Sequence, residues 1–366
     1  MAEPLKDRFG RDVPPRIATM IEAVHPDFPS AEFVRFSLEG YEGLELTPRA
    51  RRIAEALARY LPVDSAEAID ILVASLGPTE RLEGREPFLY LPHVYFVGEH
   101  GLACLEESFA AQYELTQRFT AEFSIRAFID RYPDDTLARL RRWATDPNVH
   151  VRRLVSEGTR PRLPWAPLLR RFQRDPTMVI ELLELLKDDP EPYVRRSVAN
   201  NLNDISKDHP DVVVAVCRRW LEGASHERRA LIKHALRTLV KQCHPDALAL
   251  LGFHPGSPVV VESLVVVPES ASIGGKVAIE VVLRNPDREQ QSVLVDLRVH
   301  FVKANGSAGP KVFKGCSLDL APGGQGRVRK SVSLAQHSTR RHYPGRHRVE
   351  ALVNGTALGS AWFAVA

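Results

Sequence analysis

One stretch of this chain occurs twice, and the interval between the two copies restricts the fold more than any other feature. The stretch reads Asp146-Pro-Asn-Val-His-Val-Arg-Arg-Leu-Val-Ser-Glu-Gly, and 43 residues later Asp189-Pro-Glu-Pro-Tyr-Val-Arg-Arg-Ser-Val-Ala-Asn-Asn. A period of about 40–47 residues is typical of HEAT and armadillo repeats. Each repeat is a helix pair that buries its apolar face only by stacking on its neighbours. We therefore expect stacked helical repeats whose Arg-Arg pairs lie along one surface.

The pattern of apolar residues divides the chain into two parts. Helical spacing, interrupted by Pro and Gly, continues to about residue 251, except for an aromatic insertion at 80–98 that we expect to be irregular. Short β-rich runs separated by turn signals follow, at 259–267, 276–283, 293–302, 311–318, 326–334, 347–353 and 360–365. We therefore predict an all-α HEAT-like helical repeat solenoid over residues 1–254 and an all-β immunoglobulin-like sandwich over residues 255–366.

Charge is distributed unevenly along the chain. Residues 1–120 carry 12 basic and 20 acidic side chains, residues 121–254 carry 23 and 18, and residues 256–366 carry 14 and 8. The basic excess thus begins with the repeats and continues to the C-terminus. A basic surface suggests a polyanionic partner, although the overall charge of +3 is too small to prove one.

The repeats contain candidate site residues, each of which also has a structural interpretation. Glu157 follows Arg153 at i+4 spacing and can simply pair with it. Trp165 lies in a loop that leaves the first repeat, and it can also plug the space between repeats. Asp204 ends an Asn-rich segment that is poor material for a helix interior, so it either caps a helix, pairs with an arginine or faces a polar ligand.

A weaker third repeat carries basic residues without interleaved acids. Lys233, Arg237 and Lys241 are spaced at i, i+4 and i+8, which places them on one face of a continuous helix. Like charges at that spacing repel each other, and a phosphate contact would offset the repulsion. This pattern favours nucleic-acid binding over a merely solvated face.

Other classes of site lack a signal. The four cysteines form no CxxC pair, which indicates neither a zinc knuckle nor a disulfide scaffold. His93, His100 and His209 lack metal-ligand spacing, and no GxSxG, P-loop or GxGxxG in strand context occurs. The N-terminus has no signal-peptide core, and no apolar run is long enough to span a membrane. We expect no metal, no cofactor and a cytoplasmic protein that associates with the nucleoid when bound to DNA.

Three strings together resemble the AlkC branch of the AlkC/AlkD-type alkylpurine DNA glycosylases. They are Val151-Arg-Arg-Leu-Val-Ser-Glu-Gly-Thr-Arg-Pro-Arg-Leu-Pro-Trp165, Val194-Arg-Arg-Ser-Val-Ala-Asn-Asn-Leu-Asn-Asp-Ile-Ser-Lys-Asp-His-Pro210 and Lys233-His-Ala-Leu-Arg-Thr-Leu-Val-Lys241. The β-rich tail also fits AlkC, whereas AlkD resembles the helical part alone. The resemblance implies a monofunctional enzyme that hydrolyses the N-glycosidic bond of cationic bases such as 3-methyladenine and 3-methylcytosine, without flipping the base.

The resemblance also implies roles for individual residues. Asp204, Glu157 and Glu122 would be the catalytic carboxylates, with Asp204 the first choice. Trp165 would stack beside the exposed nucleotide, and Trp143 and Trp220 are expected to be buried. The predicted DNA contacts are Trp165, Arg152, Arg153, Arg160, Arg162, Arg195, Arg196, Lys207, Lys233, Arg237, Lys241, Arg340 and Arg341.

Two other functions are compatible with the repeat pattern. One is a non-catalytic HEAT-repeat scaffold that binds DNA, and the other is a structure-specific binder of kinked DNA. The expected partner in each case is double-stranded DNA, which for the enzyme contains alkylated bases. No membrane or obligate protein partner is implied, and the absence of coiled-coil heptads makes a monomer the default. The basic 338–346 loop of the tail would enter a minor groove or track the DNA backbone, or it serves only to solubilise the tail.

Overall fold

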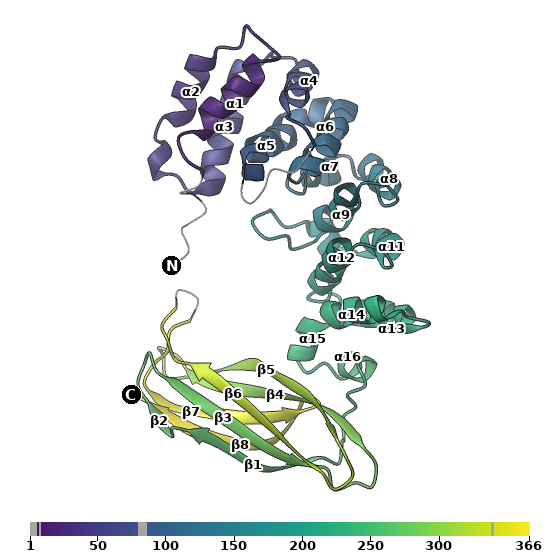
Figure 1. Cartoon of the computed structure of the whole chain (residues 1–366), viewed down its shortest axis with the longest axis vertical. Coiled ribbons are helices and arrows are strands. Elements are labelled where there is room, and N and C mark those ends of the chain that lie inside the picture. Colours follow the sequence, from purple (N-terminus) through teal and green to yellow (C-terminus); the bar gives the residue numbers. More distant parts are fainter. Residues whose placement is uncertain (1–5, 7–8, 80–85, 338–339) are drawn as a thin grey trace. The chain divides into compact units, whose positions relative to one another are not determined.

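The computed structural model describes residue 6 and residues 9–79, 86–337 and 340–366, and it divides them into two compact units (Figure 1). Unit 1 comprises residues up to 208 together with residues 226–235, and unit 2 comprises residues 209–225 and 236–366. Unit 1 is helical. Unit 2 combines the remaining helices with a mostly antiparallel β-sandwich.

The helices of unit 1 form the stacked pairs that the repeat predicts. The two copies of the repeated stretch begin α9 and α12 at Val149 and Pro192, which are 43 residues apart, and the two helices pack on each other. The α-helices of unit 1 are α1 (Val13–Glu22), α2 (Ser30–Leu38), α3 (Leu46–Tyr60), α4 (Ser65–Ser75), α5 (Leu91–His100), α6 (Leu105–Arg118), α7 (Ile125–Arg131), α8 (Pro133–Trp143), α9 (Val149–Gly158), α10 (Arg170–Arg174), α11 (Thr177–Leu186), α12 (Pro192–Ile205) and α14 (His226–Ala235); the 3-10 turns are η2 (Tyr41–Gly43), η3 (Glu86–Tyr90) and η4 (Gly101–Ala103).

The repeated Asp-Pro turns have the same construction in both copies. The Asp146 carboxylate accepts a hydrogen bond from the backbone N–H two residues on, at 2.8 Å, and the Asp189 carboxylate does the same at 2.9 Å. Arg152 donates to the carbonyls of Asp146 and Pro147, and Arg195 donates to the equivalent carbonyls of its own turn. The repetition of sequence is therefore a repetition of hydrogen bonds at helix entries.

The expectation of an irregular segment at 80–98 is wrong for its second half. Residues 80–85 lie outside the described part of the chain, but Leu91–His100 forms helix α5. Its apolar residues are buried almost all round, including Val94 and Phe96. A helix that is apolar on every face lacks the 3.6-residue periodicity from which an amphipathic helix is recognised.

Unit 2 contains the predicted sandwich. Its strands are β1 (Val260–Val267), β2 (Ser270–Ala271), β3 (Lys276–Arg284), β4 (Gln291–Val302), β5 (Ala308–Leu320), β6 (Gln325–Ser333), β7 (Gly345–Val353) and β8 (Thr356–Val365). They form one sheet in the order β1-β3-β6 and another in the order β2-β8-β7-β4-β5. Alternate residues of β3 are fully buried from Val277 to Leu283, as expected for a strand with one face on the core.

The other helices of unit 2 are α13 (Pro210–Leu221), α15 (Arg237–Lys241) and α16 (Pro245–Leu250). The sandwich contacts the residues around α16 directly. The Asn354 amide donates to the His254 carbonyl at 2.8 Å, and the Arg298 guanidinium lies 3.7 Å from the Cys243 sulfur. Trp143 in unit 1 and Trp220 in α13 are buried, which confirms the prediction for both.

The prediction that Lys233, Arg237 and Lys241 share one helix is wrong. Helix α14 ends at Ala235, and α15 begins at Arg237. Leu236 between them is completely buried and has ψ near zero, which departs from the α-helical value and breaks the regular hydrogen-bond path. The i, i+4, i+8 spacing therefore does not run along one continuous helix. In the described residues, no helix is both long and apolar enough to cross a bilayer.

Candidate active site

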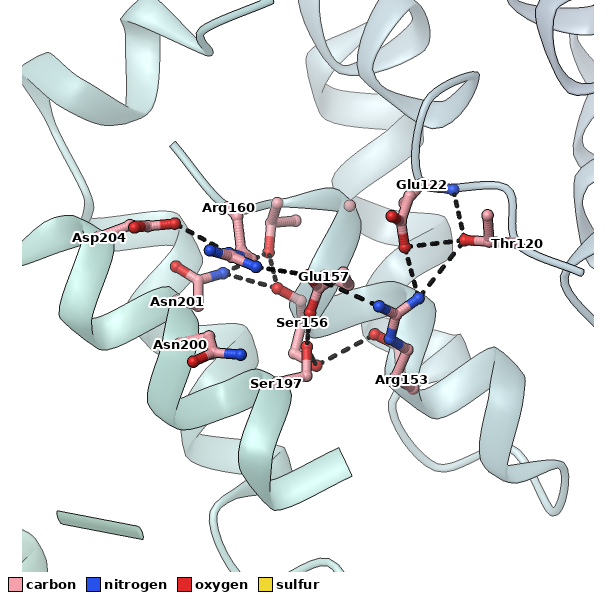
Figure 2. A network of polar contacts seen from close by, with 12 residues as sticks. Thr120, Glu122, Arg153, Ser156, Glu157, Arg160, Ser197, Asn200, Asn201 and Asp204 are labelled. Atoms are coloured by element: carbon pink, nitrogen blue, oxygen red, sulfur yellow. Dashed lines mark hydrogen bonds and ion pairs between the residues drawn. The ribbon is translucent and has the colours of Figure 1, made fainter. Parts of the chain in front are cut away.

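A cavity of about 430 Å³ opens beside α9, and four of the charged residues that the sequence singles out line it. Glu122, Arg153, Glu157 and Arg160 line it together with the exposed Trp165. The rest of the lining is Phe88, Arg118, Phe119, Thr120, Phe123, Leu163, Pro164 and Tyr193. Figure 2 shows Glu122, Arg153 and Glu157 meeting in one network of polar contacts.

Helix α9 presents Arg153 and Glu157 to this cavity because its other faces are anchored. Val151, Leu154 and Val155 are completely buried, and the Asn148 side chain accepts a hydrogen bond from the His150 N–H at the helix start. The helix ends at Gly158, where a Cβ would lie 2.6 Å from Ile125 Cγ2, so a glycine permits the close approach of α9 to α7.

The Glu157 carboxylate has polar contacts at both of its oxygens. Its Oε1 accepts from Arg160 Nη1 at 2.6 Å and faces Arg153 Nη2 at 3.5 Å, while its Oε2 accepts from Ser197 Oγ at 2.6 Å. Burial opposes its ionisation, but the two guanidinium groups and the Ser197 hydroxyl outweigh burial and hold the pKa of Glu157 below its ordinary value. Glu157 is therefore an anion at neutral pH although only 5% of its surface is exposed.

Glu122 lines the same cavity as Glu157, and the Arg153 guanidinium lies between the two carboxylates and contacts both. Arg153 forms an ion pair with Glu122 and also contacts Glu157 and the ring of Tyr193. The Thr120 hydroxyl donates to Glu122 Oε2 at 2.9 Å and accepts from the Glu122 backbone N–H. The nearby carboxylates raise the pKa of Arg153 despite its burial, so the cation that bridges them persists.

Asp204 does not line the cavity, although it is linked to it. It is 2% exposed, and its Oδ2 accepts from Arg160 Nε at 2.8 Å while its Oδ1 accepts from Lys207 Nζ at 2.8 Å. Arg160 thus joins Asp204 to Glu157 (Figure 2). The Asn-rich setting that drew attention to Asp204 is explained by packing, since Asn201 donates to the Ser156 carbonyl and the Thr159 hydroxyl at the end of α9.

The loop after α9 carries Trp165 and is fastened by Arg126, a residue that the sequence analysis missed. Arg126 is 4% exposed and donates to the carbonyls of Gly158, Arg160 and Pro167. Burial lowers the pKa of Arg126 to about 10, which leaves it charged at neutral pH. Trp165 itself is 66% exposed and has a φ of +65°, an unusual conformation for a large residue that marks a constrained, outward-pointing ring.

Aromatic residues of the cavity were also missed. Phe88, Phe119, Phe123 and Tyr193 line it, and the rings of Phe88 and Phe119 lie 5.2 Å apart. The aromatic composition of residues 80–98 was the available signal for Phe88. No local pattern signals that Phe119 and Phe123, from the α6–α7 connection, meet it.

Comparisons with known proteins relate the chain to DNA alkylation repair enzymes. Residues 114–239 match the family of DNA alkylation repair enzymes, and residues 260–366 match the C-terminal Ig-like domain of the uncharacterised protein YhaZ. The chain is 34% identical to YhaZ of Bacillus subtilis over 99% of both chains. It also matches the structure of the Pseudomonas fluorescens alkylpurine DNA glycosylase AlkC bound to DNA containing an abasic site analog, with 36% identity, a TM-score of 0.93 and complete coverage of both chains. The chain belongs to the AlkC family of alkylpurine DNA glycosylases.

In this AlkC-family chain, several predicted DNA contacts are occupied by protein groups. Arg152 forms a bidentate ion pair with Asp189 of the next repeat, at 2.6 and 3.2 Å, besides its backbone contacts. Arg162 pairs with Asp208, Lys207 pairs with Asp204, and Arg195 binds backbone carbonyls.

Other predicted contacts are at least partly exposed. Arg196 and Lys233 are exposed, and among the described residues neither shows an ion pair or a side-chain hydrogen bond. In unit 2, Lys241 and Arg341 are exposed, Arg237 is partly exposed, and Arg340 lies 6.0 Å and 5.7 Å above the rings of Phe301 and Phe313. Ser338 and Thr339 of the predicted basic loop lie outside the described residues. The described part of the AlkC-family chain contains no cluster of His, Cys, Asp or Glu suited to a metal ion.

Proposed function

We propose that this chain hydrolyses the N-glycosidic bond of cationic alkylated bases in DNA, with 3-methyladenine and 3-methylcytosine as substrates. The observation that carries the proposal is the presence of two carboxylates, Glu122 and Glu157, on the wall of one cavity, with Glu157 held ionised in a poorly hydrated setting. Anions in such a setting stabilise positive charge more strongly than they would in water.

The chemistry of the substrate explains why these groups suffice. An N3-alkylated base carries a positive charge and departs as a neutral molecule, so it needs little assistance from an acid. The remaining sugar becomes an oxocarbenium-like cation, which Glu157 and Glu122 stabilise electrostatically. Either carboxylate can also orient the attacking water and accept its proton. We propose Glu157 and Glu122 as the catalytic carboxylates, and Asp204 as a residue that acts through Arg160.

The composition of the cavity wall supports a monofunctional reaction. A glycosylase that also cleaves the DNA strand uses an amine to form a Schiff base with the sugar. Among the described residues that line the cavity, none is a lysine. Water is then the nucleophile, and the product is an abasic site.

We propose that excision proceeds without base flipping. Because the leaving base is already activated by its charge, only the sugar has to reach the carboxylates. The exposed Trp165 ring at the cavity rim would then contact the nucleotide within the duplex and stack on a base or sugar face. With a fluorescent adenine analogue at the lesion position, we expect no increase in emission on binding, whereas a flipped base would lose its stacking and brighten.

We propose that the exposed and partly exposed basic residues with no charge partner described above contact the DNA, together with Arg237 and Arg340. These are Arg196, Lys233, Arg237, Lys241, Arg340 and Arg341, with double-stranded DNA bound by a monomer. Four other basic residues would stabilise the DNA-binding surface through their bonds to protein groups, namely Arg152, Arg162, Arg195 and Lys207. Two more, Arg153 and Arg160, would hold the carboxylates of the site in place.

The test is release of 3-methyladenine and 3-methylcytosine from methylated DNA by the wild type and by Glu157→Gln. The amide keeps the shape of the side chain and removes its charge, so we expect release to fall by about 10²–10³ by analogy with other electrostatic groups. Affinity for a duplex with an abasic-site analogue, measured in parallel, should persist. Binding of DNA without release by the wild type would contradict the proposal and leave a non-catalytic DNA-binding scaffold.

A further inference from the structure

Ser197 is a buried residue of α12 whose hydroxyl reaches across to the neighbouring repeat. It is 3% exposed, and its Oγ donates to Glu157 Oε2 at 2.6 Å. The bond joins residues 40 positions apart, so it exists only because α12 packs against α9. In Figure 2 Ser197 lies below Glu157, whereas Arg160 and Arg153 approach it from the left and the right.

A second hydroxyl continues the contact into α9. Ser156 Oγ lies 2.8 Å from Ser197 Oγ and 3.1 Å from the Arg153 carbonyl. One turn along α12, Asn201 donates to the Ser156 carbonyl at 2.8 Å. Asn201 therefore fastens the backbone beside Glu157, while Ser197 holds the carboxylate itself.

The carboxylate needs such a contact because the last torsion angle of a glutamate is soft. The guanidinium groups of Arg160 and Arg153 both approach Oε1, and among the described residues only Ser197 donates a hydrogen bond to Oε2. Without this donor, nothing defines the plane of the carboxylate, and Oε2 is free to turn toward the arginines.

The contact is not a general feature of the repeats. The position equivalent to Ser197 in α9, 43 residues earlier, is Leu154, and the position equivalent to Glu157 in α12 is Asn200. Asn200 carries an amide in place of the carboxylate of Glu157, and its Oδ1 lies 3.0 Å from His234 Nε2. The serine and the glutamate are thus not repeated at the equivalent positions of the two copies.

We propose that Ser197 is a positioning residue of the glycosylase reaction, which orients Glu157 by a hydrogen bond to Oε2. This inference rests on the proposed function, in which Glu157 acts as an anion. The hydroxyl favours the ionised carboxylate, so its removal should also raise the pKa of Glu157.

The test compares Ser197→Ala with Ser197→Thr, which keeps the hydroxyl, and with Ser206→Ala. Ser206 ends the same helix, is 2% exposed and donates to the Asn203 carbonyl, so its removal costs a comparable buried hydroxyl away from Glu157. We expect Ser197→Ala to slow single-turnover base release roughly tenfold to a hundredfold, the usual effect of one hydrogen bond to a charged group. The acid limb of the pH–rate profile of Ser197→Ala should move to higher pH. The rate and the pH profile of Ser206→Ala should match those of the wild type, and Ser197→Thr should retain most of the wild-type rate.

A second measurement separates this inference from the proposed function. Carbon-13 NMR titration of the glutamate carboxyls, assigned with Glu157→Gln, reports the pKa of Glu157 without any reaction. A higher pKa in Ser197→Ala and an unchanged one in Ser206→Ala would establish the contact in solution. Equal rates and equal acid limbs in the two alanine variants would overturn the positioning role. Absence of base release by the wild type would overturn the proposed function and this role with it, even if the titration shows the contact.

Discussion

Arg160 Nε lies 2.8 Å from Asp204 Oδ2, while Nη1 of the same guanidinium donates to Glu157 Oε1 at 2.6 Å. The aspartate therefore influences the cavity through the arginine, since it does not line the cavity itself. The pair is buried, and a buried charge that loses its partner is strongly unfavourable. Asp204 is thus required for the position of Arg160, which in turn helps to keep Glu157 ionised.

The indirect role of Asp204 predicts non-additive mutational effects. Asp204→Asn should slow base release about tenfold to a hundredfold, because it weakens one charge-assisted hydrogen bond to Arg160. In an Arg160→Ala background the same substitution should change the rate less than about twofold, because the group through which it acts is gone. Single-turnover rates of the four proteins, with circular dichroism to verify folding, measure the coupling. Multiplicative effects would instead indicate that Asp204 contacts the DNA.

Substitution of Arg152 should reduce the stability of the protein without reducing its affinity for DNA. The bidentate pair of Arg152 with Asp189 joins neighbouring repeats, and the carboxylate is almost completely buried. Arg152→Gln should lower the free energy of unfolding by about 3–5 kcal/mol, the usual effect of leaving a buried partner unpaired. Urea denaturation measures this change. If affinity of the folded variant for duplex DNA also falls, Arg152 contacts phosphate as well.

For Arg196, the second arginine of the next Arg-Arg pair, we expect the opposite result to that for Arg152. It is exposed and lines a groove with Ala199 and His234. Arg196→Gln should change stability by less than about 0.5 kcal/mol. It should also reduce the slope of log affinity against log salt concentration by about 1, as expected for one lost phosphate contact. A salt titration of DNA binding decides this, and an unchanged slope excludes the contact.

For substitutions of Trp165 we expect a loss of DNA affinity at little cost in stability. The ring is exposed, so Trp165→Ala should leave the fold intact and weaken binding of lesion DNA by about 1–3 kcal/mol if the ring stacks on a nucleotide. Because φ is +65°, Trp165→Gly should be at least as stable as Trp165→Ala while losing the same affinity. Thermal unfolding and DNA titrations test both parts. Wild-type affinity in both variants would contradict a stacking role.

The burial of His93 should make the stability of the protein depend on pH. His93 is 1% exposed in α5, and burial lowers its pKa to about 4. The unfolded chain binds a proton at this residue near pH 6.5 and the folded chain does not, so stability falls as the pH decreases from about 6.5 to about 4 and then levels off. The loss attributable to His93 is about 3 kcal/mol.

His93→Leu should remove this contribution. The pKa values of His342 and His347 are also lowered by burial, so part of the pH dependence should persist in the variant. The difference between the two proteins in urea denaturation at pH 7.5 and pH 4.5 therefore isolates His93. Parallel losses of stability in both proteins would show that His93 is protonated in the folded state.

The sequence by itself determined the repeat, the change from helices to strands and the family. Each of these depends on order along the chain: a 43-residue period, Asp-Pro turns that recur with their hydrogen bonds, and alternating apolar residues such as those of β3. It also singled out Glu122 and Glu157, which line one cavity. It misjudged α5 and the Lys233–Lys241 segment, where complete burial and a turn at Leu236 override local periodicity.

Only the tertiary structure decided which charges are available. The two arginines of each pair are adjacent in sequence, yet successive residues of a helix point about 100° apart, so Arg152 binds the next repeat while Arg153 reaches the cavity. The same holds for Asp204, which its neighbours along the chain cannot distinguish from a residue exposed to DNA. Its partner Arg160 comes from the loop after α9, just as Ser197 of α12 reaches Glu157 of α9, and the energy of an ionised side chain is set by such partners and by exclusion of water.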